Sequence, residues 1–188
     1  MRAFWKKGSV ISLKLKENLY SLAQMVNPSA KMRFYNVFND KDEWSSIDLN
    51  YKNTLFCVPV GNILIQKLGV RRIPLAEVIP SNEPCERLFI NVASNAEGYR
   101  LRNECIWRGG NLVDEGYDAR NAAYNSPIII QNLDITVHRE IILKFELENM
   151  YGDIIARNRL IRYYETGVNI EPLKFDIFPG FSLPAETQ

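Results

Sequence analysis

"KKGSVISLKLKENLYSLAQMV", residues 6–26, is the stretch that decides the fold. Its first half alternates apolar Ile11, Leu13 and Leu15 with polar residues, which is the period-two spacing of a strand with one buried face. A polar break follows, and it ends at Asn18, a residue type that tolerates the left-handed backbone of a tight turn. The second half is again extended in character. We therefore predict an antiparallel hairpin at the start of the chain.

Further strand-like segments follow at short intervals. Each is an alternating or continuous apolar run, which is typical of partly or fully buried strands. Pro59 lies in one of them and, because proline cannot donate to a ladder, it predicts an edge strand or a bulge there. The predicted strands cover residues 32–38, 54–60, 62–68, 86–93, 99–107, 126–133 and 139–148.

Residues 153–165 have a different pattern. Asp153 is a candidate N-cap and Gly167 is a candidate C-terminal stop. The apolar residues between them fit one face of a short helix. The letters "RLIRYY" also have the aromatic and branched content of a strand, so a strand stays open as the alternative.

Together these patterns predict an α+β protein that is predominantly antiparallel β. We expect a small barrel-like N-terminal sheet, followed by a second β-rich part with at least one helix. At 188 residues the chain is long enough for one compact domain over 1–188. A Pro-rich connection at 74–85 allows a subdivision into an N-terminal β unit, 1–73, and a C-terminal β-rich unit, 86–188.

Charge and cysteine content restrict the class of protein. The chain has 23 basic and 22 acidic residues, whereas a nucleic-acid binder usually has a clear basic excess. No stretch is apolar enough to span a membrane, and the N-terminus lacks the pattern of a secretion signal. Cys57, Cys85 and Cys105 are odd in number and widely spaced, which fits a reducing compartment. We therefore predict a cytoplasmic protein.

No set of residues in the sequence indicates a catalytic or metal site. The single histidine, His138, would have to serve any Ser–His–Asp or Cys–His arrangement, and it lies just before the predicted 139–148 strand with no nucleophile motif in the chain. The spacings typical of zinc, calcium and phosphate sites are also absent from the sequence. We predict no enzymatic activity, no metal, no cofactor and no small-molecule substrate.

Two segments combine acidic residues with an aromatic ring, one around Trp44 and one around Tyr117. Such a loop suits a protein–protein contact, because the ring supplies buried area and the acids attract a basic partner. The alternative is an ordinary polar loop whose ring packs onto the core. The candidate contact residues are Asp40, Asp42, Glu43, Trp44, Asp48, Asp114, Glu115, Tyr117 and Asp118.

A group of arginines beside a tryptophan provides an alternative surface. On a strand, Arg100 and Arg102 would share one face, and aromatic rings beside arginine can stack on nucleobases. A charged outer face is the more common explanation of such a stripe. The alternative function is a nucleic-acid-binding adaptor that uses Arg100, Arg102, Trp107 and Arg108.

Residues 6–60 combine a glycine-led hairpin with aromatic and apolar strand positions. These features are Lys7-Gly8, Val10-Ile11, Leu13, Leu15, Tyr20, Ala23-Gln24-Met25-Val26, Phe34, Phe38 and "LFCV" at 55–58. In them the chain resembles the opening of the small, mostly-β immunity proteins of bacterial polymorphic-toxin and contact-dependent growth-inhibition systems. The resemblance implies a cytosolic protein without enzymatic activity, which binds one cognate toxin domain, often a nuclease, and blocks its active site or substrate surface. A nuclease presents lysines and arginines to phosphate, and acidic loops could cover them.

Overall fold

The computed structural model describes residues 5–27, 30–92, 99–101, 104–106, 109–116 and 126–181, with the backbone alone at 99–101 and 104–106. The chain divides into two compact units. Unit 1 contains Met1–Glu86 and Asn149–Asn169, and unit 2 contains Arg87–Glu148 and Ile170–Gln188. The chain thus leaves unit 1 just after the Pro-rich segment. It later returns to unit 1 with residues 149–169, which the predicted subdivision assigned to the C-terminal unit, 86–188.

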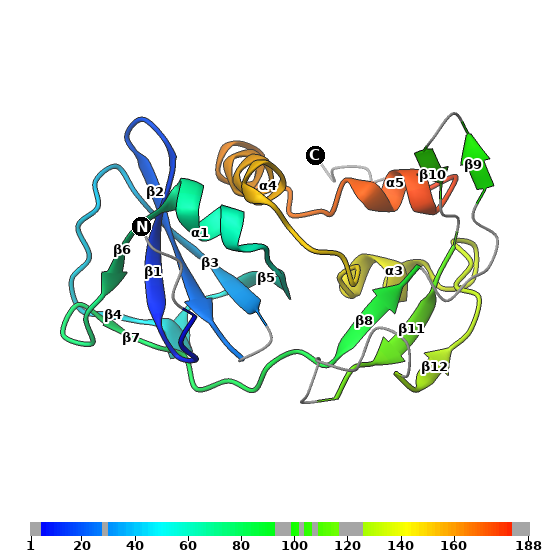
Figure 1. Cartoon of the computed structure of the whole chain (residues 1–188), viewed down its shortest axis with the longest axis horizontal. Helices are drawn as coiled ribbons and strands as arrows, with labels where there is room; N and C mark the ends of the chain where they lie inside the picture. Colours follow the sequence, from blue (N-terminus) through cyan, green and yellow to red (C-terminus); the bar gives the residue numbers. More distant parts are fainter. Residues whose placement is uncertain are drawn as a thin grey trace. The chain divides into compact units, whose positions relative to one another are not determined.

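Unit 1 is built on a five-stranded antiparallel sheet with the order β5-β3-β2-β1-β6 (Figure 1). The predicted hairpin is confirmed, because β1 pairs with β2 and Asn18 between them has a φ of 54°. β5 is an edge strand, as Pro59 predicted. The strands are β1 (Val10–Lys16), β2 (Leu19–Met25), β3 (Lys31–Asn39), β5 (Thr54–Pro59) and β6 (Gly69–Ile73).

Both faces of this sheet are buried. One face packs against α1 (Asn62–Leu68) and α4 (Asp153–Thr166), with Leu13, Phe34 and Val58 at its centre. The opposite face packs against the chain on either side of a short parallel pair, β4 (Ile47–Asp48) and β7 (Val78–Ile79), and against the 3-10 turn η1 (Leu49–Tyr51). The sheet therefore has two cores, and polar side chains that fall between its apolar residues are buried too.

α1 corrects the prediction of a strand at 62–68. Its buried residues Leu64, Ile65 and Leu68 recur at helical spacing, while Ile63 is exposed. The consecutive apolar letters concealed that spacing, because a short apolar run fits a buried strand and a buried helix equally well.

α4 is the predicted helix, so the strand alternative at 153–165 is wrong. The N-cap is Gly152 and not Asp153, whose charge instead lies in the first turn and complements the helix dipole. Gly167 ends the helix with a φ of 71°, a left-handed conformation that favours glycine.

A buried arginine holds α4 in unit 1. The Arg159 guanidinium lies 4.0 Å from the ring centroid of Phe56 on β5, and its Nη1 donates to the Tyr151 hydroxyl at 2.8 Å. Its Nε donates to Asn169 Oδ1 at 3.0 Å, just beyond the end of the helix. These contacts explain why the chain returns to unit 1 at this point.

Unit 2 contains a three-stranded antiparallel sheet with the order β12-β11-β8. Its elements are β8 (Leu88–Asn91), β9 (Tyr99–Leu101), β10 (Glu104–Ile106), β11 (Asn111–Asp114), β12 (Ile128–Ile130), α3 (Arg139–Lys144) and α5 (Leu173–Ile177). Residues 99–107, predicted as one strand, contain β9 and β10, which pair with each other. Gly110 lets β11 approach β8, because a Cβ there would lie 2.9 Å from Ile90 Cγ2 and 3.1 Å from the Asn91 carbonyl oxygen.

The predicted strand at 139–148 is wrong in its first part, which forms α3. A turn precedes the helix: the Asp134 carboxylate accepts from the Thr136 amide, and the His138 amide donates to the Asp134 carbonyl oxygen at 2.7 Å. Only the second part is extended, and there Leu147 bridges Ile90 of β8. The alternation of apolar and polar residues continues through this segment. The local hydrogen bonds of the turn nevertheless set the backbone conformation at its start, and a helix forms there.

These elements confirm the predicted α+β class with mostly antiparallel pairing. Across the part of the chain that the structure describes, every helix is too short or too polar to cross a bilayer.

Candidate functional site

A row of polar side chains crosses three neighbouring strands on one face of the unit 1 sheet. The register places Gln24 of β2 opposite Arg33 of β3, and Arg33 opposite Cys57 of β5. Side chains of directly opposed residues lie on the same face. Each of the three is at most 4% exposed. We call Gln24, Arg33 and Cys57 the polar row.

Residues 81–86, which we call the cover segment, lie over this row. The Gln24 amide donates from Nε2 to the Ser81 carbonyl oxygen at 2.9 Å, and its Oε1 accepts from the Ser81 amide at 2.9 Å. The Tyr35 hydroxyl also donates to Gln24 Oε1, at 2.8 Å. Burial raises the pKa of Tyr35 to about 12, so the hydroxyl keeps the proton that it donates.

Arg33 binds the cover segment through most of its guanidinium. Its Nε and Nη2 donate to the two carboxylate oxygens of Glu86 at 3.0 and 3.1 Å, a bidentate pair. It also donates to the carbonyl oxygens of Glu83 and Pro84, and a carboxylate oxygen of Glu83 lies 3.5 Å from its Nη1. Burial lowers the pKa of Arg33, but the hydrogen bond and charge of Glu86 outweigh it, so the net pKa lies above its ordinary value. Arg33 is thus a buried cation with a fixed counter-ion.

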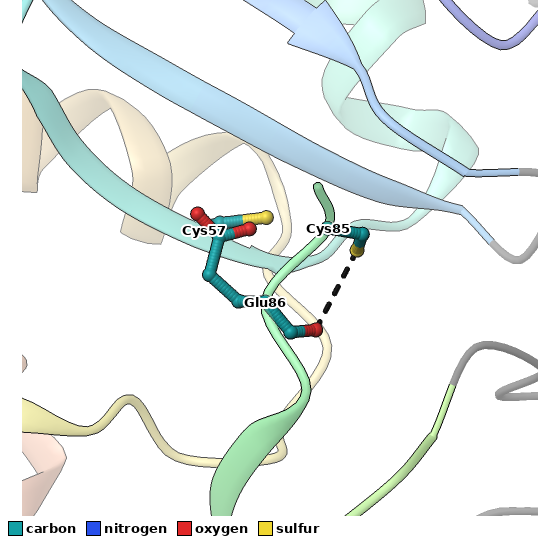
Figure 2. Close-up of side chains that lie close together, drawn as sticks. All are labelled: Cys57, Cys85 and Glu86. Atoms are coloured by element: carbon teal, nitrogen blue, oxygen red, sulfur yellow. Dashed lines mark hydrogen bonds between the residues drawn. The ribbon is translucent and has the colours of Figure 1, made fainter. Parts of the chain in front are cut away.

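Cys85 of the cover segment lies beside Cys57 at the β5 end of the row (Figure 2). The two sulfurs and a carboxylate oxygen of Glu86 all lie within 4.8 Å of one another. The Cys85 thiol lies 3.5 Å from the Glu86 carbonyl oxygen, to which it donates. Three ligand atoms of this kind suggest a metal, but both Glu86 oxygens already accept from Arg33, and the guanidinium would repel a cation. The cluster therefore fits thiol chemistry better than metal binding.

The two thiols differ in acidity. The pKa of Cys85 lies below its ordinary value, chiefly because Cys57 donates a hydrogen bond to its sulfur, with help from the nearby charges of Lys31 and Arg33. Burial raises the pKa of Cys57 well above its ordinary value. Cys85 is also the more accessible of the two, because it is half-buried whereas Cys57 is buried. Cys85 is therefore the more reactive thiol of the pair.

The structure places Trp44 differently from the prediction of a contact residue. Its ring is only 5% exposed and packs in the second core of unit 1. Its Nε1 donates to Asp42 Oδ1 at 2.8 Å. The ring therefore offers almost no surface to a partner, and packing onto the core, the alternative for this loop, describes it better.

Arg71 of β6 fixes the 40–48 loop through its carboxylate Asp42 and also binds Glu77, which precedes β7. Its Nε donates to Asp42 Oδ2 at 2.9 Å, and its Nη2 donates to Glu77 Oε2 at 2.7 Å. Asp48 accepts at 2.9 Å from the Asn50 amide and so caps η1. Two of the predicted contact acids, Asp42 and Asp48, thus have structural partners, whereas Asp40 and Glu43 are exposed.

The pair between Arg71 and Glu77 makes stability depend on pH. Arg71 donates to Glu77 and lowers the pKa of that carboxyl below its ordinary 4.5. A depressed carboxyl pKa stabilises the folded state above 4.5, and this contribution is lost as the pH falls through the lower folded-state value. We expect Glu77→Gln to remove part of the loss of stability that the protein shows between about pH 5 and pH 2, measured by urea unfolding. Glu43→Gln, which changes an exposed acid of the 40–48 loop, is the matched control, and equal pH slopes for the two variants would contradict the assignment.

Beside this loop the structure exposes an aromatic residue that sequence reasoning missed. Tyr51 of η1 is 86% exposed, and Ile79 of the adjacent β7 is exposed as well. Asp48 lies opposite Ile79 in the β4–β7 register. No sequence pattern distinguishes Tyr51 from a core aromatic residue, so only the structure shows that its side chain is exposed. We call Asp48, Tyr51 and Ile79, together with the exposed acids Asp40 and Glu43 of the loop that precedes them in the chain, the η1 surface.

The second acidic segment is held mainly within unit 2. Arg87 donates to both carboxylate oxygens of Asp114, at 3.0 and 2.6 Å, and Asp114 Oδ1 also accepts from the Gly116 amide. Glu115 is buried. Tyr117 and Asp118 lie outside the described residues, so the structure brings no acidic–aromatic surface together in the described part of this segment.

The structure describes little of the predicted nucleic-acid surface, and it places His138, the single candidate for a catalytic histidine, in a turn. Arg100 lies on β9, where only the backbone is described, and Arg102, Trp107 and Arg108 lie outside the described residues. His138 is the residue before α3, and its Nδ1 accepts from the Asp134 amide at 3.1 Å. This histidine therefore closes a local turn.

Comparison with known proteins identifies a domain family. A family model described as "Domain of unknown function (DUF8309)" matches residues 1–183, which run through both units. No curated protein and no solved structure matches the chain.

Proposed function

We propose that this chain, which belongs to the domain family DUF8309, is an immunity protein that binds a cognate bacterial toxin domain and neutralises it. The toxin would be a nuclease, blocked at its active site or at its substrate surface, and the complex would form in the cytoplasm. The chain itself would catalyse no reaction. The resemblance of residues 6–60 to immunity proteins supports this function, and so does the η1 surface.

The η1 surface is the observation that carries the proposal. Tyr51 is exposed, whereas its surroundings in the chain are fixed: Leu49 of η1 packs in the same core as Trp44, and Arg71 pairs with Asp42 of the preceding loop. An exposed aromatic ring on a preformed frame buries a large area on binding and loses little conformational freedom. This is the arrangement that a protein-binding surface needs.

The charges of the η1 surface suit a basic partner. Asp40 and Glu43 are exposed on the loop, and Asp48 lies beside Ile79. A nuclease carries lysines and arginines that hold the phosphates of its substrate, so an acidic surface would attract it and speed association. The proposed contact set therefore keeps the exposed acids of the predicted loop and replaces Trp44 with Tyr51.

The function is tested in cells. The C-terminal domain of a large secreted protein encoded immediately upstream would be expressed from an inducible promoter, with and without this chain. We expect the chain to restore growth, and the purified chain to bind the toxin domain with measurable affinity. Growth that is not restored, the lack of any such upstream gene, or turnover of a substrate by the purified chain alone would each contradict the proposal.

The role of the acids is tested with Asp40→Lys/Glu43→Lys. Because attraction between opposite charges mainly raises the association rate, we expect this rate to fall about tenfold at low salt and to depend less on salt. Glu17→Lys/Asp176→Lys makes the same change in net charge at exposed acids of other elements and serves as the control. Surface plasmon resonance at several salt concentrations measures both variants. Equal association rates would exclude the loop acids from the interface.

A further inference from the structure

We propose that Cys57 and Cys85 are a redox-active thiol pair. Peroxide oxidises Cys85, and Cys57 then forms a disulfide with it, which joins the β5 end of the polar row to the cover segment. The inference concerns the buried face of the sheet and does not depend on the proposed toxin binding. It assigns a modification site to a cluster that is separate from the η1 surface.

The position of the two sulfurs supports a disulfide. They lie within 4.8 Å of each other, on segments that are far apart in the sequence (Figure 2). A disulfide needs a sulfur–sulfur distance of about 2.05 Å, so one thiol has to move. Cys57 is held in β5, whereas Cys85 lies in the cover segment, which has no regular secondary structure. The cover segment can therefore make the adjustment while the sheet stays in place.

The surroundings give the two thiols different roles: Cys85 is oxidised first, and Cys57 then attacks it. Two buried cations, Lys31 and Arg33, lie on the neighbouring strand β3, and their charges lower the pKa of Cys85, whereas the charge of Glu86 acts in the opposite direction. Positive charge favours the thiolate, which is the nucleophile in thiol oxidation. The lowered pKa of Cys85 and its greater exposure agree with this role. Cys57, which is buried and holds its proton, is placed to attack the oxidised sulfur.

The chemistry proceeds in two steps. The Cys85 thiolate attacks one oxygen of hydrogen peroxide, the O–O bond breaks, and the products are Cys85 sulfenic acid and hydroxide, which takes a proton to become water. The Cys57 sulfur then attacks the sulfenic sulfur, its proton goes to the departing hydroxyl, and a second water leaves as the S–S bond forms. Overall, two thiols and one peroxide give one disulfide and two waters. Two molecules of a small thiol restore both cysteine thiols by disulfide exchange: the first forms a mixed disulfide, and the second releases it as the disulfide of the small thiol.

Oxidation would have a defined structural consequence. The bond would join β5 covalently to the cover segment, which also carries Glu86, the counter-ion of Arg33. It would close the chain between residues 57 and 85 into a loop, which restricts the unfolded state. We expect the melting temperature of the oxidised protein to rise and to return to its starting value after reduction.

The test uses the full, reduced chain. It is treated with one equivalent of hydrogen peroxide and then digested without reductant, and the peptides are identified by mass spectrometry. We expect a Cys57–Cys85 cross-link, which Cys105→Ser retains. In Cys57→Ser, dimedone should trap a sulfenic acid at Cys85, because the second thiol is missing. In Cys85→Ser, no trapping at Cys57 is expected.

Three results would overturn the assignment. One is a disulfide that joins Cys105 to either residue in place of the expected bond. Another is iodoacetamide alkylation of native protein at neutral pH that does not favour Cys85 over Cys57 by about tenfold or more. The third is tight binding of added zinc that is lost in both Cys57→Ser and Cys85→Ser, because a metal site would then explain the cluster.

Discussion

Glu86→Gln is expected to lower the free energy of unfolding by about 3 kcal/mol. The side chain of Arg33 is 1% exposed, and the substitution would leave this buried cation without its main counter-ion. Breaking a buried pair from one side costs about 3–5 kcal/mol, because the remaining charge stays desolvated. We place the effect at the lower end because a carboxylate oxygen of Glu83 lies 3.5 Å from Arg33 and partly compensates. Urea unfolding at neutral pH measures the change.

The two partners of this pair should not be equivalent. Arg33→Met is expected to cost less than Glu86→Gln, because the Glu86 side chain is 37% exposed and can be hydrated after the arginine is removed. The double variant should then be more stable than the sum of the two single effects predicts. Additive effects would show that the two residues are not coupled.

An exposed ion pair provides the matched control. Lys16 and Glu165 pair at the surface of unit 1, with side chains 45% and 50% exposed. Glu165→Gln removes the same charge with the same change in shape, and we expect it to cost less than about 1 kcal/mol. If Glu86→Gln lowers the free energy of unfolding no more than Glu165→Gln does, the buried pair of Arg33 and Glu86 contributes no more to stability than an exposed ion pair.

Trp44→Ala and Tyr51→Ala are expected to change different properties of the protein, its stability and its binding affinity. Trp44 is in the second core, so Trp44→Ala should lower the free energy of unfolding by about 3–5 kcal/mol. Tyr51 is exposed, so Tyr51→Ala should change this free energy by less than about 0.5 kcal/mol. If the proposed function is right, Tyr51→Ala should instead weaken toxin binding about 30-fold, the loss of about 2 kcal/mol typical of a central contact.

Thermal or urea unfolding and isothermal titration calorimetry separate these two effects. A stable Trp44→Ala variant would contradict the burial of the ring. A Tyr51→Ala variant that is folded and binds the toxin with unchanged affinity would remove Tyr51 from the proposed interface, while leaving the acids of the η1 surface to their own test.

Sequence patterns predicted the elements that depend on local chemistry. The β1–β2 hairpin followed from the alternation of Ile11, Leu13 and Leu15 and from the turn at Asn18. α4 was one of two alternatives for residues 153–165, and Gly167 ends it as predicted, although Ile154 and Tyr164 of the predicted apolar face are exposed. The errors at α1 and α3 arose where apolar letters are consecutive, because such runs do not distinguish a helix from a strand until it is known which residues are buried.

The candidate site was predictable only in part. The acids of the 40–48 loop predict a contact surface, and Asp40 and Glu43 are exposed, whereas the ring of Trp44 packs in the core and the exposed ring is that of Tyr51. The polar row was missed, although one signal was present. Arg33 interrupts an apolar strand, and a charge at such a position needs a partner that the neighbouring letters do not supply.

The sequence by itself determined the α+β class and the first hairpin, because strand alternation and turns depend on residues a few positions apart. At 153–165 it left a helix and a strand open. Only the tertiary structure decided which polar side chains are buried and which aromatic ring is exposed. Arg33 and Cys57 are covered by residues about 30 to 50 positions away, and Trp44 is covered by strands on both sides of it in the chain. Burial is a property of such distant contacts, so no local pattern could report it.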